Sequence, residues 1–279
     1  MSISIFSLFR NSESYIKDSL KRFDNLEKNT EAEISFFFYE NDSVDKTPSI
    51  LKRWMKSKSG KLQCDTLNPR SFKSELDPER MMHLSQCRNK MQALDVDKNS
   101  DYSLIIDSDI LFESDTLNQF LQYSSLEFSM LTSNVRQNVP CKMGSGEKDS
   151  YYDSSILNDT DGMPGMTWSY NPFFNTSDRK KFENNEPIKV NRAFGSCAFL
   201  PTSIFHKCQW SSFGESEHFS FCDKVRKHGD IFFIPSIQPR VEIKDQDFPW
   251  ANDVIKTQKH LLENKWNRFL WKRTKATIP

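Results

Sequence analysis

The sequence predicts an α/β fold with a mostly parallel sheet flanked by helices, and three features of its first half favour this fold. Short apolar segments rich in β-branched and aromatic residues alternate with segments whose apolar residues recur at helical spacing. Two predicted helices begin at a polar residue followed by proline, which is a typical helix start. Acidic residues directly follow two predicted strands. The alternation predicts parallel strands, because parallel neighbours are joined through crossover helices.

The elements of the first half are justified by their apolar patterns. Ile16, Leu20 and Phe23 share one face of the first helix, and Thr47 is the expected N-cap of the second. The expected order is strand 3–9, helix 12–23, strand 34–39, a helix from Thr47-Pro48, a helix from Asp77-Pro78, strand 104–106 and a helix over 115–123.

The second half has a weaker pattern. Residues 133–190 are rich in Asn, Asp, Ser, Gly and Pro, which favours a functional loop region, with a partly disordered insertion as the alternative. Residues 253–275 predict a helix with a basic face, either solvated or in contact with a membrane surface. The other expected elements are strands at 126–132, 198–200 and 231–234 and a helix over 217–228.

Composition excludes several classes of protein. The chain has 38 basic and 38 acidic residues, so electrostatics gives no case for nucleic acid as a partner. Its six cysteines form no C-x-x-C pair and are expected to be reduced and mostly buried. No apolar run reaches transmembrane length, and the first residues lack the layout of a signal peptide. We therefore expect a soluble, cytoplasmic protein.

The segment after the third strand carries the strongest chemical signal. The buried run Leu104–Ile106 ends in Asp107 and Asp109, separated by Ser108. Two acids beside a buried strand are costly unless a cation neutralises them. Carboxylate oxygens suit Mn²⁺ or Mg²⁺, which in turn bind phosphate oxygens. The pattern indicates a metal–diphosphate site; a solvated turn whose acids cap the next helix is the alternative.

The second strand is followed by the acidic segment 40–47. Glu40 and Asp42 stand where acids of other nucleotide folds accept hydrogen bonds from a base or ribose. An Asx-rich turn is the alternative interpretation. The segment therefore predicts nucleoside contacts at the same sheet edge as Asp107.

Two further segments supply possible contacts to a nucleotide. Phe9 and Arg10 end the first strand, and Ser108 stands between the two acids. Arg88 lies on the helix that Pro78 opens and could face a diphosphate, since arginine matches phosphate geometry. A surface arginine is the alternative for Arg88.

Together these segments resemble the GT-A glycosyltransferases, which transfer a sugar from a nucleotide-sugar. The resemblance is closest to the family of cryptococcal capsule mannosyltransferases and covers about residues 5–240. A chain of this composition without an anchor is also similar to the soluble glycosyltransferases of chloroviruses. The motifs that carry the resemblance are Tyr39–Thr47, Arg88-Asn89, Asp107–Asp109, Tyr152-Asp153, Ser196-Cys197, Ser216–Cys222 with Gly229, and Pro235-Ser236.

The resemblance implies a GT-A-like, Rossmann-like fold with a smaller acceptor-side subregion. It implies a nucleotide-sugar-binding half over residues 1–132, an acceptor-binding and catalytic half over 133–245, and an amphipathic helix or tail over 246–279. It implies that Asp107 and Asp109 bind Mn²⁺ or Mg²⁺. The residues it implies at the nucleotide and its diphosphate are Phe9, Arg10, Glu40, Asp42, Arg88, Asp107 and Ser108.

The resemblance also assigns the catalytic carboxylate. Glu217, twelve residues before Gly229, is the implied general base, with Glu215 as reserve and Asp153 as a further candidate if Glu217 plays no part. The alternative role of Glu217 is that of an acid stabilised by a helix dipole. His218 stands where the family has cysteine and where GT-A enzymes more broadly have a second acid. Three aromatic residues could stack on acceptor sugars or belong to the core, namely Tyr152, Trp168 and Tyr170.

The expected reaction moves xylose, mannose or another sugar from a UDP-sugar to a hydroxyl of an oligosaccharide or glycoprotein acceptor. The setting would be viral or cell-surface glycan synthesis, in the host cytoplasm if viral. A GDP-sugar is the second choice of donor, including a retaining GDP-mannose-dependent enzyme. A sugar-nucleotide nucleotidyltransferase is a rival, although no Gly-rich loop follows the first strand. A non-catalytic glycan-binding protein is another.

Overall fold

The computed structural model describes residues 1–241, apart from 69–71, 73–76, 141–146, 168 and 213–215. The predicted helix at 253–275 therefore lies outside the described residues, as do Glu215 and Trp168. Residues Met1–Val241 form one compact unit.

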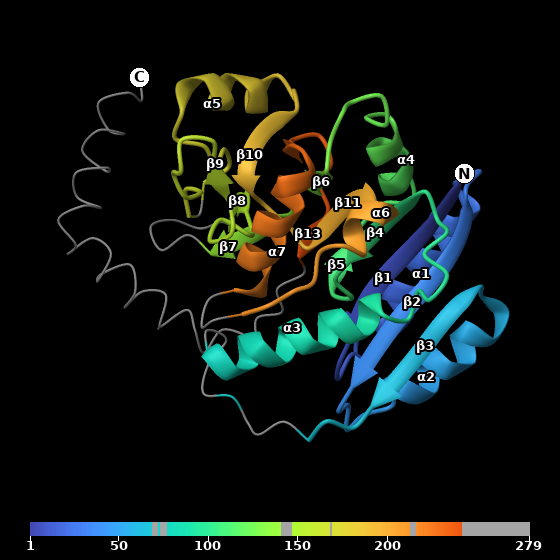
Figure 1. Ribbon diagram of the computed structural model, residues 1–279. Helices are drawn as coiled ribbons and strands as arrows, with labels where there is room; N and C mark the ends of the chain where they lie inside the picture. Colours follow the sequence, from blue (N-terminus) through green and yellow to red (C-terminus); the bar gives the residue numbers. More distant parts are fainter. Residues whose placement is uncertain (69–71, 73–76, 141–146, 168, 213–215, 242–279) are drawn as a thin grey trace. The chain divides into compact units, whose positions relative to one another are not determined.

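A nine-stranded sheet forms the centre of this unit (Figure 1). Its strands are parallel from β3 through β2 and β1 to β4, and β6 is parallel to β12, whereas the other neighbours are antiparallel. Strand β11 lies between β4 and β6, so the sheet is continuous from the first half of the chain to the second. The strands in spatial order are β3 (Gly60–Asp65), β2 (Glu33–Asn41), β1 (Ser2–Phe9), β4 (Tyr102–Ile106), β11 (Cys197–Pro201), β6 (Met130–Ser133), β12 (Ile231–Ile234), β10 (Ile188–Arg192) and β9 (Asn158–Asp159).

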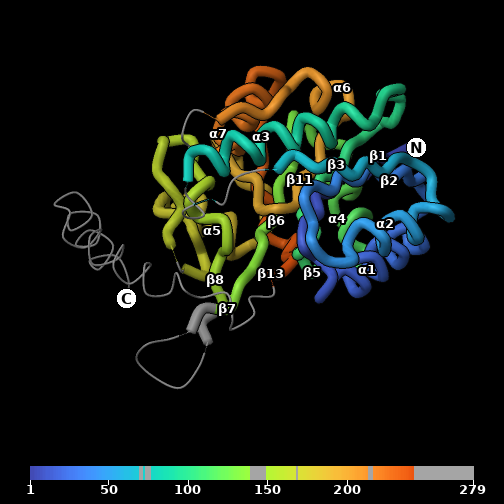
Figure 2. The backbone as a smooth tube through the Cα atoms, turned by 90° about the horizontal axis from the view of Figure 1, so that it is seen from below, coloured from blue at the N-terminus to red at the C-terminus, as the bar shows by residue number. Residues whose placement is uncertain are grey.

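Helices cover both faces of the large sheet (Figure 2). Buried residues of α1, α2 and α4 join one apolar cluster, and those of α3, α5, α6 and α7 join the other. This layered arrangement confirms the predicted α/β class. The helices are α1 (Ile16–Lys28), α2 (Thr47–Trp54), α3 (Pro78–Gln92), α4 (Thr116–Leu121), α5 (Thr176–Glu183), α6 (Thr202–Phe205) and α7 (Glu217–Val225), with 3₁₀ turns at Met55–Ser57 and Arg226–His228.

A second, four-stranded sheet lies in the order β5-β13-β7-β8. Its inner strand β7 carries Arg136, whose fully buried guanidinium bonds to the Asn134 side chain and the Tyr170 carbonyl and pairs with Asp149. The strands are β5 (Ile110–Leu111), β7 (Arg136–Pro140), β8 (Glu147–Tyr151) and β13 (Arg240–Val241).

The prediction of a loop region at 133–190 is wrong in part. The structure places β7, β8, β9, α5 and part of β10 there. Polar side chains of this segment bond to its backbone instead: Asp159 accepts hydrogen bonds from the backbone of Asp161 and Met163, and the Asn175 side chain caps α5. Regular structure therefore forms without a long apolar pattern.

The predicted helix starts had mixed outcomes. Asp77 is the N-cap of α3 and accepts from Glu79 N, as expected. Thr47 is not the N-cap of α2, because that position is Lys46 and the Thr47 hydroxyl accepts from Ser12 N at 2.7 Å. Helix α1 begins at Ile16 rather than at 12, since the preceding residues form a turn in which Tyr15 N bonds to Ser12 O.

Candidate active site

A cavity of about 490 Å³ opens at the carboxyl ends of β1 and β4. Its walls come from the ends of these strands, from α3, from the segment after β8 and from the start of α7. Open α/β sheets place their ligands at this edge. The predicted site residues that line the cavity are Phe9, Arg10, Arg88, Asp107, Ser108, Asp109, Tyr152 and Glu217.

The acidic turn after β4 is held by the backbone around it. Asp107 N donates to Ser196 O at 3.0 Å, and the Ser108 carbonyl accepts from the Ser19 hydroxyl at 2.9 Å. Ser108 itself is buried, with its hydroxyl 3.3 Å from the Tyr15 hydroxyl. The two flanking carboxylates are therefore fixed at the cavity, while Ser108 packs beneath them.

Asp109 is exposed at the cavity, and no cation pairs with it among the described residues. The surrounding protein displaces part of its water and, together with the charge of Asp107, raises the pKa of Asp109 to about 6. A carboxylate in this position is stabilised by a nearby positive charge.

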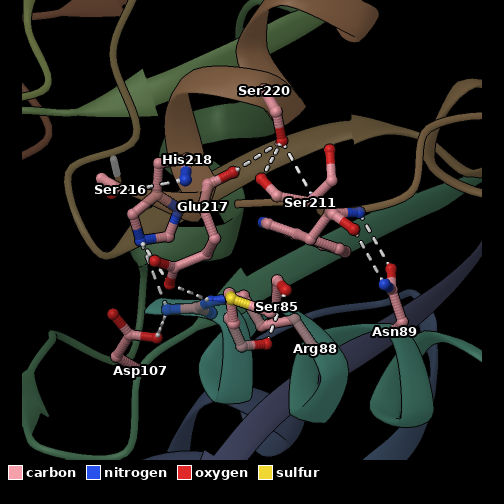
Figure 3. A network of polar contacts seen from close by, with 11 residues as sticks. Ser85, Arg88, Asn89, Asp107, Ser211, Ser216, Glu217, His218 and Ser220 are labelled. Atoms are coloured by element: carbon pink, nitrogen blue, oxygen red, sulfur yellow. Dashed lines mark hydrogen bonds and ion pairs between the residues drawn. The ribbon is translucent and has the colours of Figure 1, made fainter. Parts of the chain in front are cut away.

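Arg88 is the centre of the polar network in Figure 3. This side chain is 5% exposed and comes from α3. Its Nε donates to Glu217 Oε1 at 3.0 Å, and its Nη2 donates to Asp107 Oδ1 at 3.1 Å. The guanidinium carbon lies 5.3 Å from the centre of the Phe194 ring. Arg88 thus joins the acidic turn to the start of α7.

Glu217 is 2% exposed, and its Oε1 is the atom that Arg88 contacts. Burial opposes its ionisation, but the Arg88 guanidinium outweighs that effect and lowers the pKa of Glu217. His218 Nε2 lies 3.4 Å from the same oxygen, and its ring stacks on Phe194 with centroids 4.0 Å apart. Burial lowers the pKa of His218 to about 4, so this imidazole is neutral at pH 7.

Asp153 lines the cavity; in the sequence it belongs to the Tyr-Asp match and is, with Glu215, an alternative to Glu217 as the catalytic carboxylate. It is half-buried and follows β8, and its Oδ2 accepts from Gly195 N at 3.0 Å. Burial, together with the charges of Asp107 and Glu217, raises the pKa of Asp153 to about 7. Asn41, Tyr15 and Ser196 also line the cavity and were not singled out as site residues. Nothing in the spacing of Asp153 and the acidic turn along the chain predicts that both line one cavity.

Glu40 and Asp42 are not among the residues that line the cavity. Glu40 is buried and accepts from Ser43 N at 2.9 Å. Asp42 accepts from Leu67 N at 2.6 Å and from Asn68 N at 2.8 Å, and so fastens the segment after β3. The structure gives both acids contacts within the protein, and their role at a nucleoside stays a prediction.

The predicted acceptor aromatics lie in different places. Tyr152 lines the cavity and is 42% exposed. Tyr170 is exposed away from the cavity lining, where its ring lies against the Arg136 guanidinium and meets Phe182 edge to face. Of the two described aromatics, only Tyr152 is placed to meet a molecule bound in the cavity.

The residues present fit a divalent cation that also contacts substrate. No group of three or more His, Cys, Asp or Glu side chains with metal-binding geometry occurs in the described residues. Mg²⁺ sites that act on nucleotides are commonly built from one or two carboxylates, substrate phosphates and water. Asp109 and the Asp107 Oδ2 atom, which has no partner among the described residues, supply that donor set.

The sheet order, its crossover helices and the acidic turn at its edge are those of the GT-A fold. Staphylococcus aureus TarS 1-349 aligns with a TM-score of 0.51 and 13% identity, over 86% of this chain and 60% of that chain. Mannosyltransferase PcManGT from Pyrobaculum calidifontis, solved with GDP-Man and Mn²⁺, aligns with a TM-score of 0.54 and 10% identity, over 93% and 61%. This chain therefore spans about three fifths of the length of either structure.

The chain belongs to the family described as Cryptococcal mannosyltransferase 1, whose sequence model matches residues 3–230. The resemblance drawn from its motifs is therefore confirmed for the family. A comparison with curated protein sequences found no match. A further similar structure, S. aureus TarS 1-349 in complex with UDP-GlcNAc, has a TM-score of 0.52 and 13% identity over 88% of this chain and 59% of that chain.

Two other predictions concern the described residues. None of their helices combines the length and apolar character needed to span a bilayer. The described cysteines are free, as expected: Cys64, Cys87, Cys197, Cys208 and Cys222. All of these except Cys64 are buried.

Proposed function

We propose that the protein is a metal-dependent glycosyltransferase that moves a sugar from a nucleoside diphosphate sugar to a hydroxyl of a glycan. The observation that carries the proposal is the cavity in which the acidic turn and Arg88 meet at the carboxyl edge of the parallel strands. A pair of acids needs a cation, and a diphosphate needs positive charge around it. A divalent ion held by the two acids, together with Arg88, would meet both needs.

Asp107 and Asp109 would hold Mn²⁺ or Mg²⁺ beside the diphosphate. A divalent ion bound there neutralises charge that develops on the leaving group. Arg88 supports the same role, because its Nη1 is buried and has no hydrogen-bond partner among the described residues. A diphosphate oxygen would satisfy that donor, since buried polar groups normally have partners. Arg10 and Phe9, at the end of β1, complete the donor side of the cavity.

The donor is proposed as a UDP-sugar, with GDP-mannose as the second candidate. One similar structure was solved with UDP-GlcNAc and another with GDP-Man. The family description favours mannose as the sugar. The acceptor would be an oligosaccharide or glycoprotein whose sugar ring packs on Tyr152, because aromatic faces bind the apolar faces of sugars. A cytoplasmic location, a viral or cell-surface glycan as product, and membrane contact through residues 246–279 remain parts of the proposal.

A donor screen tests this function. The protein is incubated with UDP-glucose, UDP-xylose, UDP-GlcNAc or GDP-mannose, a mixture of methyl glycosides and Mn²⁺, and release of UDP or GDP is measured. We expect release from one donor, loss of release in EDTA, and loss in Asp109→Ala. Asp115→Ala is the matched control, since Asp115 is an exposed acid near the turn whose carboxylate, within the described part of the chain, accepts only from Gln119.

Two results would contradict the proposal. Release that persists unchanged in EDTA and in Asp109→Ala would remove the metal from the mechanism. Binding of glycans without release from any donor would favour a non-catalytic glycan-binding protein. Product analysis by NMR of the anomeric proton decides between inversion and the retaining GDP-mannose alternative.

A further inference from the structure

We propose that Ser196 and Asp153 bind two neighbouring hydroxyls of the donor sugar and thereby select the sugar that is transferred. This inference rests on the function proposed above, and it concerns recognition of the sugar rather than the route of the transfer. Both side chains line the cavity, and both belong to or bond with the turn that precedes β11.

Ser196 has a backbone conformation that serine rarely adopts. Its φ is +50°, in the left-handed region that glycine enters without steric cost. Asparagine and aspartate tolerate this region better than serine does. They account for most of the described non-glycine residues with positive φ, which are Asn11, Asp42, Asn68, Lys98, Asn185 and Ser196. Glycine would suit position 196 better, so the serine side chain needs an explanation other than the shape of the turn.

The hydrogen bonds of the turn do not use the Ser196 side chain. Asp107 N donates to the Ser196 carbonyl at 3.0 Å. Gly195 N donates to Asp153 Oδ2 at 3.0 Å, and the Ser133 hydroxyl donates to the Gly195 carbonyl at 3.1 Å. Each of these bonds uses a backbone atom of the turn, which glycine at position 196 would leave in place.

The Ser196 hydroxyl is available to a ligand. The residue is 7% exposed, and the cavity is what it faces. Its hydroxyl has no hydrogen-bond partner among the described residues, yet it is not among their fully enclosed polar atoms. Strained backbone of this kind clusters at binding sites, where the strain places a side chain that the ligand needs.

Asp153 offers a second oxygen beside the same turn. Its carbonyl accepts from Ile156 N at 3.1 Å and Leu157 N at 3.3 Å, which fixes its backbone directly after β8. Gly195 N holds its Oδ2, whereas its Oδ1 has no hydrogen bond or ion pair with any described residue. The anchored carboxylate therefore keeps one oxygen for a molecule in the cavity.

This pair of groups favours a sugar over a phosphate as the ligand. A carboxylate accepts hydrogen bonds and repels a phosphate, whereas a sugar hydroxyl can donate to it. The Ser196 hydroxyl can donate to one sugar hydroxyl or accept from it. One sugar ring with two neighbouring free hydroxyls would satisfy both residues, as buried polar groups normally are.

The turn also has the right location for the donor sugar. The Ser196 carbonyl bonds to Asp107 N, so the turn lies directly beside the acidic motif proposed to hold the metal and diphosphate. The sugar of a donor is attached to that diphosphate. Tyr152, proposed to meet the acceptor, precedes Asp153 in the chain and lines the same cavity. The transferred sugar would lie between the two, against Ser196 and Asp153.

Calorimetry in Mn²⁺ tests the proposal by comparing each donor with its own nucleoside diphosphate. The donors are UDP-glucose, UDP-xylose, UDP-GlcNAc and GDP-mannose, and the nucleotides are UDP and GDP. Ser196→Gly should weaken binding of the preferred donor about 3–10-fold, since one neutral hydrogen bond is lost. Asp153→Asn should weaken it about 10–100-fold, since the lost bond involves a charge. Affinity for the free nucleotide should not change in either variant.

The melting temperature separates this role from a structural one. Ser196→Gly should keep the wild-type value, because relief of the positive φ offsets the greater freedom of glycine in the unfolded chain. Lys98→Gly is the matched control, since Lys98 is exposed, has a φ of +52° and lies outside the cavity lining. Asp161→Asn is the control for Asp153→Asn, as an exposed acid outside that lining. Both controls should bind the donor like the wild type.

Two outcomes would overturn this inference alone. Unchanged donor affinity in either variant would remove that residue from the sugar site. An equal loss of donor and nucleotide affinity would mean that the turn only shapes the diphosphate site. A wild-type protein that binds none of the four donors would overturn the inference together with the proposed function. Donor binding by the wild type therefore distinguishes the two failures.

Discussion

Replacing Arg88 by methionine should destabilise the protein strongly, because it leaves a buried carboxylate without its cation. Glu217 is 2% exposed and bonds to Arg88 at 3.0 Å. Removing one partner of a buried ion pair costs roughly 3–5 kcal/mol. For a domain of this size each kcal/mol lowers the melting temperature by about 2–4 °C, so we expect a decrease of roughly 6–20 °C. Methionine fills similar volume, which limits any contribution from a cavity.

Thermal unfolding followed by circular dichroism measures this effect. Arg226→Met is the matched control, since this arginine is exposed and bonds to the Asn191 side chain, and a surface substitution changes stability by about 0.5 kcal/mol or less. The double variant Arg88→Met with Glu217→Gln should lose less than the sum of the single variants, because the second change removes the unpaired charge. A melting temperature of Arg88→Met equal to that of the control, or strict additivity in the double variant, would refute the buried pairing.

Three further changes test other parts of the structure by melting temperature. Gly195→Ala should lower it, since alanine disfavours the positive φ and its Cβ would approach Ser133 O to 2.4 Å; a neutral result would contradict the geometry of that turn. Burial raises the pKa of Asp153 from 3.8 to about 7, so the folded protein holds a proton that the unfolded chain releases at lower pH. The stabilisation from this proton is complete below pH 4 and is lost as the pH rises to about 7. The loss is at most about 4 kcal/mol and is smaller where water reaches the carboxyl group. Asp153→Asn should therefore make the melting temperature less dependent on pH between about 4 and 7, and identical curves for the variant and the wild type would count against the raised pKa. Thr47→Val should cost about 1–3 kcal/mol by leaving the Ser12 N–H unsatisfied, and an unchanged melting temperature would show that water replaces the hydroxyl.

The strand-end chemistry could be predicted from the sequence because it is local. Leu104–Ile106 is a short apolar run with acids directly after it, and strand alternation with helices places that end at the ligand edge. The start of α3 was predictable for the same reason, as Asp77 caps the backbone only two residues away. Local hydrogen bonds leave a readable pattern in the sequence.

Contacts between distant segments leave no such pattern. Arg88 and Glu217 are 129 residues apart, and nothing in either segment specifies the other as its partner. The same limit explains Thr47, whose hydroxyl accepts from Ser12 N rather than capping its own helix. Strand β3 was missed because its residues are only half-buried and include Gln63 and Asp65, which weakens the apolar alternation.

A crystal structure of the protein with UDP and Mn²⁺ tests the central claim most directly. We predict the diphosphate in the cavity at the carboxyl ends of β1 and β4, with Mn²⁺ coordinated by Asp109 and Asp107 and a phosphate oxygen bonded to Arg88. A nucleotide bound away from this cavity, or a diphosphate whose Mn²⁺ contacts neither aspartate, would contradict the account.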